Sequence, residues 1–322
     1  MTAPLVSVLI PCINAARYVG AAIESVLAQT YSPIEVIVVD DGSTDGSAAK
    51  VMAFADRGVV LVEQAKGNAA AARNRGFTQS TGAFVLFLDA DDLIAPGHIA
   101  ALLDRLRPGS KAVAMGQWDR FSQSPGDATF PAKPGYHDAF GVDWLCEDWL
   151  GGQPMTQCGT FLIPRCLLND VGGWDERLGL IDDFEFFARL LSKGAGVRFA
   201  PEARLFYRSG IGGSLSARTS RRAAESACLS LLTGTGHLLA ARDDRQTRRA
   251  SANMLRTFDY TFYPAFPDLR RKLEARIREL GGSDLQPVGP PGFHALRRWI
   301  GWRPARRIQH LRNRLRQPAP TP

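Results

Sequence analysis

The sequence predicts an α/β protein with a mainly parallel central sheet, followed by a helical C-terminal region. In the first half, short apolar runs alternate with segments of helical periodicity, which is the pattern of consecutive βαβ units. From residue 221 onward the pattern is helical. With 322 residues and 45% hydrophobic content, the chain can bury the core of one large domain or of two smaller ones.

The expected elements follow one another closely in the first half. The apolar runs that predict strands lie at 5–11, 34–41, 59–64 and 83–91. The segments that predict helices between them lie at 16–29, from about 46, and at 68–79. Residues 110–220 are more mixed, with strand-like runs at 160–165 and 197–208. Helices are expected again after residue 221, and a Pro/Gly linker (287–292) precedes the last helical segment, 293–316.

The net charge of +7 is concentrated at the C-terminal end. Beyond residue 284 there is no acidic residue and there are eight arginines, which leaves a charge of −1 for the preceding chain. A nearly neutral body offers nucleic acid no binding face, so we expect no nucleic-acid partner.

The five cysteines form no Cys-x-x-Cys pair, which favours a reducing, cytoplasmic compartment. No apolar run approaches the roughly 18 residues that a membrane-spanning helix needs.

Two acidic clusters follow strands of the predicted sheet. Asp40 and Asp41 end the run VIVVDD, and Asp89, Asp91 and Asp92 follow VLFL. The carboxyl ends of parallel strands meet at one edge of a sheet, where ligands bind, so both clusters are expected to open onto one site. Crowded carboxylates favour a divalent cation, and oxygen ligands favour Mg²⁺ or Mn²⁺. The alternative for either cluster alone is a solvated turn that caps a helix.

Between the clusters, the segment GNAAAARNRG (67–76) places Arg73 and Asn74 early on a predicted helix. At the start of a helix these side chains are expected to reach a bound anion. For Arg73, a surface salt bridge is an equal alternative.

Four motifs in this order and spacing carry a resemblance: SVLIPCINAARYVGAAIESVLAQTY, VVDDGSTD, NAAAARNRG and LFLDADD. Together they resemble the family 2 glycosyltransferases, which have the GT-A fold, over about residues 5–216. The resemblance implies an inverting transferase that uses a nucleotide-sugar donor and a divalent metal, Mn²⁺ or Mg²⁺. Family frequency favours a UDP-sugar.

The resemblance also implies a GT-A domain over 1–220, with a nucleotide-binding half (1–110) and an acceptor-binding half (111–220), and a set of donor-binding residues. Beyond this domain, the helical pattern and the charge predict a helical extension over 221–284 and a basic tail over 285–322. The residues expected at the nucleotide are Pro11, Cys12, Asn14, Asp40, Asp41, Asp89 and Ala90. Of these, Asp41 would accept a hydrogen bond from the base, and Asp89 would lie near the ribose. The metal would bind Asp91.

The segment LGLIDDFEFFARLL (178–191) has apolar residues at helical spacing, with Asp182 and Asp183 at the start of the expected helix. A helix N-terminus lowers the pKa of a carboxylate, so Asp183 is expected to be ionised. The segment resembles the Glu-Asp motif of the family, with Asp182 on the acceptor side. Asp183 then occupies the position of the base that accepts the proton of the acceptor hydroxyl. The alternative is a plain helix cap.

Two loops complete the expected site. The segment LFYRSGIGGSLS (205–216) resembles the lid that closes over the diphosphate, where Arg208, Ser214 and Ser216 donate to phosphate oxygens. Many relatives have a histidine where this chain has Gly210, so Arg208 would neutralise more of the charge of the leaving diphosphate. The alternative for the whole segment is a flexible surface loop. Upstream, GGWDERLG (172–179) resembles an acceptor-side loop, so Trp174 is expected either to stack on a sugar or to lie in the core.

The basic tail combines arginines with tryptophans and aliphatic residues, which predicts contact with an anionic membrane surface. The alternative is a helix that packs on the body of the protein.

The combined prediction is a cytoplasmic enzyme that transfers a sugar to a glycan or lipid-linked acceptor in cell-surface polysaccharide synthesis. One alternative is a nucleotidyltransferase, but PCINAARYVG after the first strand lacks a Gly-rich, Lys-bearing phosphate loop. A second alternative is a non-catalytic module that binds a glycan or a membrane, which the intact acids disfavour.

Overall fold

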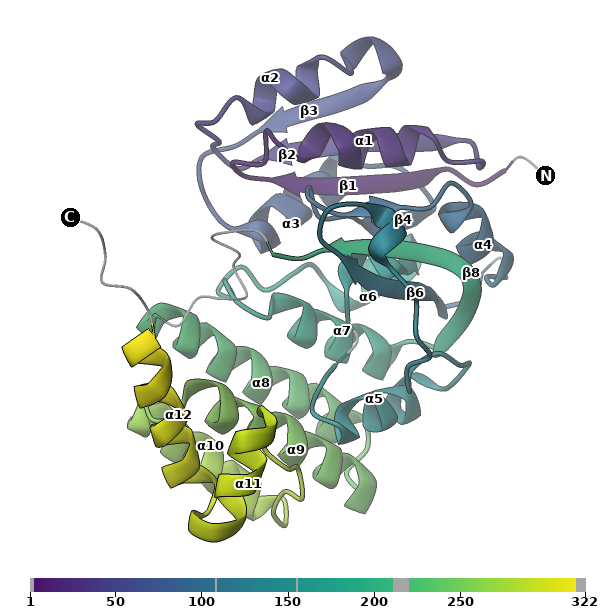
Figure 1. Ribbon diagram of the computed structural model, residues 1–322. Coiled ribbons are helices and arrows are strands. Elements are labelled where there is room, and N and C mark those ends of the chain that lie inside the picture. The colour runs from purple at the N-terminus through teal and green to yellow at the C-terminus, as the bar shows by residue number, and fades with distance from the viewer. Residues whose placement is uncertain (1–2, 108, 155, 211–219, 317–322) are drawn as a thin grey trace.

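A computed structural model describes residues 3–107, 109–154, 156–210 and 220–316 of the chain. It has a strand-and-helix part, and a group of helices from the C-terminal third packs beside it (Figure 1). The predicted α/β class with a helical C-terminal region is confirmed.

Within the described residues, one sheet has eight strands in the order β3-β2-β1-β4-β7-β6-β8-β5. The strands are β1 (Val6–Cys12), β2 (Ile34–Asp40), β3 (Val59–Glu63), β4 (Phe84–Phe87), β5 (Leu93–Ile94), β6 (Val113–Phe121), β7 (Phe161–Pro164) and β8 (Val197–Arg208). The first four pair in parallel, as predicted. The second half is mixed, because β7 runs antiparallel to β4 and β6, and β5 runs antiparallel to β8.

The helices cover both faces of this sheet and extend beyond it. The helices that lie within or beside the sheet part are α1 (Val19–Leu27), α2 (Ser47–Met52), α3 (Ala69–Gln79), α4 (His98–Asp104), α5 (Gly141–Leu150), α6 (Arg165–Val171) and α7 (Asp182–Lys193). The C-terminal helices are α8 (Arg221–Ala241), α9 (Arg245–Phe262), α10 (Pro267–Glu279), α11 (Pro291–Ile300) and α12 (Trp302–Arg316).

Alternate residues of β1 point to opposite faces of the sheet, and both faces are buried. Val8 and Ile10 share a core with residues of α1, α2 and α4. Leu9 belongs to a second core, which includes residues of α3, α5 and α7. This two-sided burial explains why the strand reads as an uninterrupted apolar run.

The C-terminal helices share the second core with the sheet. Helix α8 packs on α7, and α9 packs on α5. The contact with α7 is close at Gly234, where an added Cβ would lie 2.6 Å from the ring of Phe184. The expected boundary at residue 220 therefore separates two segments that contribute to one hydrophobic core. Among the described helices, none has the length and apolar character that crossing a bilayer requires.

Candidate active site

The carboxyl ends of β1, β2 and β4 lie at one edge of the sheet. Cys12 pairs in register with Asp40, and Leu9 pairs with Phe87, two residues before Asp89. Strands β2 and β3 extend to one side of β1 and β4 extends to the other, so the strand order reverses here. Ligands of open α/β sheets bind at this kind of position. Both acidic clusters therefore follow strands that end at the same edge, as the sequence predicted.

Asp40 and Asp41 have different surroundings although both are buried. Oδ1 of Asp41 accepts hydrogen bonds from Gln64 Nε2 and from the backbone N–H of Gly67, both at 2.7 Å. Its Oδ2 accepts no hydrogen bond from the described residues and is free to face a ligand. Asp40 instead closes its own turn, because its Oδ2 accepts the backbone N–H of Ser43 at 3.0 Å.

The loop after β1 is locked onto the turn after β2. Asn14 has a positive φ of 48°. Its backbone N–H donates to Ser43 Oγ at 2.9 Å, and its Oδ1 accepts the N–H of Thr44 at 2.9 Å. Pro11 and Cys12 lie at the end of β1. Burial raises the pKa of the Cys12 thiol to about 11, so this segment offers a ligand its backbone rather than a thiolate.

Arg73 of α3 joins the two halves of the site. Its Nη2 lies 2.8 Å from Asp89 Oδ1, and its Nη1 lies 2.7 Å from Asp182 Oδ2. The guanidinium also lies over the ring of Trp174, 4.4 Å from the centroid. The Arg73 side chain is buried, but the side chains of Asp89 and Asp182 are 35% and 18% exposed, so the two ion pairs are only partly shielded from water. The sequence left a ligand anion and a surface salt bridge open for Arg73, and the contacts present here are ion pairs of a buried arginine with two carboxylates of the protein.

Trp174 and Asn74 also have structural roles. Trp174 is buried, stacked on Phe186 at a centroid distance of 3.9 Å and covered by Arg73, so its ring is not available to stack on a sugar. The amide of Asn74 accepts the N–H of Trp174 at 2.7 Å and donates to Glu176 Oε1 at 2.8 Å. This amide fixes the loop that follows α6, which differs from its predicted role at the nucleotide.

Asp182 and Asp183 begin α7, as the helical spacing predicted. The expectation of a lowered pKa for Asp183 is wrong. Burial, followed by the charge of Asp182, raises the pKa of Asp183 to about 7, although Arg73 and the N–H of Phe184 act in the opposite direction. Desolvation outweighs the helix terminus here, because the helix dipole is worth at most about 2 kcal/mol. Asp183 is thus poised to gain or lose a proton near neutral pH.

Arg208 at the end of β8 lies beside the second acidic cluster. Its Nε donates to the backbone oxygen of Asp91 at 2.8 Å, and its backbone N–H donates to Asp92 Oδ1 at 2.8 Å. The rings of Tyr18 and Phe121 lie 5.0 and 4.4 Å from the guanidinium carbon. These contacts hold Arg208 next to the cluster. The predicted lid residues Ser214 and Ser216 lie outside the described residues.

The second cluster is suited to a cation but does not form a complete metal site. Burial, followed by the charge of Asp89, raises the pKa of Asp91 to about 6, and the same two causes raise that of Asp92. Ala90, between Asp89 and Asp91, is buried. Over the described part of the chain, no group of three His, Cys, Asp or Glu residues is arranged to hold a metal ion. An ion on Asp91 would therefore need oxygens from a bound phosphate to complete its coordination.

Helix α8 supports the segment that leads into α7, which the sequence did not predict. Ile181 precedes the helix with a φ of 50°, a strained conformation for a β-branched residue. Its carbonyl oxygen accepts a hydrogen bond from Ser230 Oγ at 2.6 Å. The hydroxyl of Ser226 accepts the N–H groups of Gly179 and Leu180 at 2.8 and 2.9 Å. Serines on a helix have no sequence signal that would reveal this role.

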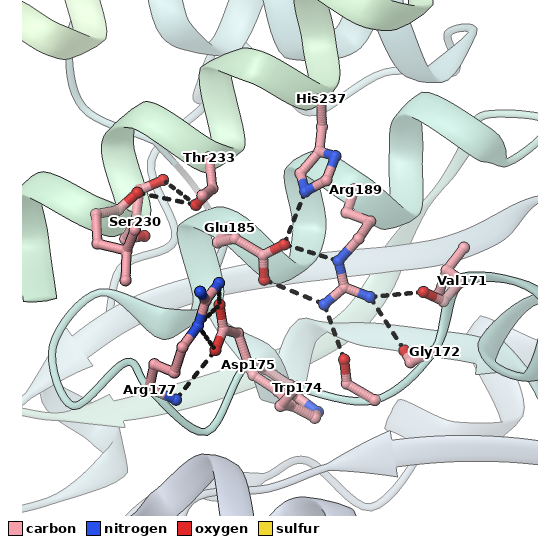
Figure 2. Close-up of polar contacts among 12 residues, drawn as sticks. Val171, Gly172, Trp174, Asp175, Arg177, Glu185, Arg189, Ser230, Thr233 and His237 are labelled. Carbon is pink, nitrogen blue, oxygen red and sulfur yellow. Dashed lines mark hydrogen bonds and ion pairs between the residues drawn. The ribbon is translucent and has the colours of Figure 1, made fainter.

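A polar network ties the loop after α6 to α7 and α8 (Figure 2). Arg189 pairs with Glu185 at 2.7 Å, and its guanidinium donates to the backbone oxygens of Val171 and Gly173, both at 2.8 Å. His237 of α8 reaches the same Glu185 carboxylate at 3.0 Å. No sequence pattern points to His237, because the five histidines of the chain have no metal-ligand spacing. The network fixes the loop that carries Trp174 and, through it, the ring against which Arg73 lies.

Known proteins of similar sequence are glycosyltransferases. Residues 7–158 match the model of a family described as Glycosyl transferase family 2. Glycosyltransferase GlyG of Streptococcus pneumoniae serotype 4 (strain TIGR4) is 35% identical over 129 residues, which are 39% of this chain and 43% of GlyG. WfgD of Escherichia coli, a UDP-Glc:alpha-D-GlcNAc-diphosphoundecaprenol beta-1,3-glucosyltransferase, is 45% identical over 91 residues, which are 28% of this chain and 36% of WfgD. The matched segments span less than half of these two relatives.

The fold is similar to that of S. aureus TarS 1–349 in complex with UDP-GlcNAc. The TM-score is 0.65 at 17% sequence identity, and the match covers 85% of this chain and 80% of TarS 1–349. At this identity the likeness concerns the fold alone.

Proposed function

Because the chain belongs to the glycosyl transferase family 2 and has the GT-A fold, we propose that it transfers a sugar from a UDP-sugar with inversion. The acceptor would be a hydroxyl of a glycan or of a lipid-linked saccharide in cell-surface polysaccharide synthesis. The observation that carries the proposal is the bridge from Asp89 through Arg73 to Asp182. It sets the start of α7, and so Asp183, beside the acids at the strand ends.

The donor would lie along the edge formed by β1, β2 and β4. Asp41 has one carboxylate oxygen held by Gln64 and Gly67, so the other can accept an N–H of the base. The backbone from Pro11 to Asn14 would line the nucleoside, and Asp40 would keep its turn closed. UDP is supported by two of the similar proteins, since UDP-Glc is named for WfgD and UDP-GlcNAc for the TarS complex.

The diphosphate would lie between Asp91 and Arg208. When bound, a divalent ion on Asp91 would neutralise charge on the departing phosphate oxygens. Arg208 would add a fixed positive charge, because its backbone and Nε contacts hold it beside that carboxylate. Ser214 and Ser216 keep their predicted role as donors to phosphate.

Asp183 would act as the general base. As the acceptor oxygen attacks C1 of the sugar, Asp183 takes the hydroxyl proton and the nucleoside diphosphate leaves from the opposite side. Its pKa of about 7 suits this task, because such a carboxylate is ionised in a large fraction near neutral pH and is basic enough to accept a proton. Asp182 would face the acceptor while Arg73 holds its other oxygen.

A lipid-linked acceptor is presented at a membrane, so we place the reaction in the cytoplasm at the inner membrane face.

The direct test of donor binding is a thermal-shift panel of UDP-, GDP-, TDP- and CMP-linked ligands with and without Mn²⁺. A ligand that binds the folded state raises the melting temperature by mass action. UDP with Mn²⁺ is expected to give the largest shift. If no nucleotide raises the melting temperature, the proposal that the chain binds a nucleotide-sugar donor is wrong.

A further inference from the structure

Helices α11 and α12 pack on the body through one side and leave the other side uncovered. On α12 the inner side includes Trp302, which packs against Tyr260 and Tyr263 of the α9 region at centroid distances of 4.9 and 5.2 Å. Ala305, three residues on, is buried, and Arg306 lies over the ring of Phe293. This packing anchors the helix pair, which Figure 1 shows along the outside of the C-terminal helices.

The outer side of α12 mixes apolar and basic residues. Arg307, Ile308, Leu311 and Arg312 are exposed and recur at the spacing of one helix face. The end of α11 adds Trp299, which is 88% exposed and is the most exposed large apolar residue described. We name Arg298, Trp299, Arg307, Ile308, Leu311 and Arg312 the tail surface.

The arginines of the tail surface are available to an external anion. Among the described residues, Arg298, Arg307 and Arg312 form no ion pair with a carboxylate, although the Arg307 guanidinium carbon lies 5.6 Å from the ring centroid of Tyr263. By contrast, Arg303 on the same helix lies 3.4 Å from Asp259. No acidic residue follows Asp284 in the sequence, so no charge within the tail offsets these arginines.

We propose that the tail surface docks on the anionic face of a lipid bilayer, with Trp299 and Leu311 at the level of the headgroups and the arginines paired with lipid phosphates. An interfacial helix needs apolar side chains to insert and basic ones to meet the negative surface potential, and this face has both. A purely electrostatic partner such as nucleic acid would leave the exposed aliphatic residues in water.

The position of the surface suits a lipid-linked acceptor. Trp302, at the start of α12, packs where α9 ends. Helix α8 begins near the same corner, because Arg221 pairs with Asp268 of α10 at 2.7 Å. Helix α8 thus begins on the side of the body against which α12 packs, and its Ser226 and Ser230 contact the segment that leads to Asp182. Access to a lipid-linked acceptor is a benefit of docking only if the chain has the proposed function, whereas the docking itself does not depend on that function.

The test is co-sedimentation of the full chain with vesicles of phosphatidylcholine alone and with 30% phosphatidylglycerol, as a probe composition. We expect binding to the anionic vesicles that weakens with added salt, and little binding to the neutral ones. Substituting Gln for Arg298, Arg307 and Arg312 should lower partitioning on the order of 100-fold, since each basic residue near such a surface contributes roughly a fivefold factor. Trp299→Ser with Leu311→Ser should lower it about tenfold or more.

Matched variants elsewhere on the surface provide the controls. Phe140→Ser removes an apolar residue that is 71% exposed, and Gln at Arg75, Arg107 and Arg245 removes three exposed charges. These variants should bind anionic vesicles as the wild type does. Equal loss in the control variants, or equal binding of all variants, would overturn the proposal.

Other occupants of the surface have their own outcomes. Binding to single-stranded RNA but not to anionic vesicles would assign the surface to nucleic acid, and a dimer abolished by Trp299→Ser would assign it to a second copy. Either result would overturn membrane docking. The thermal shift with UDP is measured on the same samples. If vesicle binding is intact but UDP gives no shift, the proposed donor is wrong and the proposed membrane docking stands.

Discussion

The Nη1 atom of Arg73 lies 2.7 Å from Oδ2 of Asp182, a contact between residues 109 positions apart. Through its other nitrogen the same guanidinium holds Asp89 at 2.8 Å. One buried cation therefore connects the acids that follow β4 with the acids that begin α7. It offsets part of the repulsion among these carboxylates and sets the distance between the two parts of the site.

Replacing Arg73 by Met should both destabilise the protein and inactivate it. The substitution leaves Asp89 and Asp182 without their shared partner. Because these carboxylates are partly exposed, the cost should be on the order of 2 kcal/mol, below the roughly 3 kcal/mol typical of a fully buried pair. Chemical denaturation should show this loss at pH 8. The control is Arg75→Met on the exposed side of the same helix, which should change the free energy of unfolding by about 0.5 kcal/mol or less. Similar effects of the two variants would contradict the role of Arg73 as a bridge.

Asp183→Asn should lower turnover on the order of 10²–10⁴-fold, which is the usual contribution of a general base. The thermal shift produced by UDP and Mn²⁺ should stay the same, because the assigned donor contacts come from other residues. Asp175→Asn is the matched control, since that carboxylate pairs with Arg177 on the loop before α7. Turnover of Asp183→Asn within a factor of three of wild type would show that the base lies elsewhere.

The pH profile should follow Asp183. Burial raises its pKa from 3.8 to about 7, so kcat/KM for the wild type should rise about tenfold per pH unit below 7 and level off above pH 8. The folded state retains the proton longer than the unfolded state does, so this carboxyl lowers stability as the pH rises from about 4 to 7. Asp183→Asn should therefore raise the melting temperature at pH 8 but not at pH 4. A profile that falls with pH over this range would contradict the assignment.

Mn²⁺ should stabilise the protein with UDP more at pH 8 than at pH 5. Burial and Asp89 raise the pKa of Asp91 to about 6, so this carboxyl is mostly protonated at pH 5 and is available to a cation at pH 8. Asp91→Asn should remove the Mn²⁺-dependent part of the thermal shift. The exposed Asp56→Asn should leave it intact. An Mn²⁺ effect that survives in Asp91→Asn would place the ion on other ligands.

Ser230→Ala tests the support from α8. Losing the hydrogen bond to the carbonyl of Ile181 should cost about 1 kcal/mol of stability and loosen the strained turn before Asp182 and Asp183. Turnover should fall more than tenfold while the UDP thermal shift persists, since a misplacement of about 1 Å can cost 10²-fold in rate.

The control for this effect lies one turn away on the same helix. The hydroxyl of Thr233 bonds to Leu229 and Ser230 of α8 itself, so Thr233→Val should leave turnover near wild type (Figure 2). Equal losses in Ser230→Ala and Thr233→Val would indicate a general effect on the helix rather than positioning of α7.

The sequence by itself determined the elements whose signals are local. The run from Val6 to Ile10 reads as a strand buried on both faces, and the acids after Val39 and Leu88 stand at strand ends because turn residues follow apolar runs. The helical spacing after Asp183 likewise predicted the start of α7. Such patterns depend on the pleat of a strand and the turn of a helix, which repeat within a few residues.

Tertiary structure alone decided which side chains meet and how they are charged. It made Arg73 a bridge between Asp89 and Asp182, buried Trp174 against Phe186, and brought Ser230 under the turn at Ile181. These contacts join segments about 10 to 110 residues apart, and no local periodicity encodes such distances. The protonation of Asp183 followed from the same packing, because the water and charges around a carboxyl are set by every segment that surrounds it.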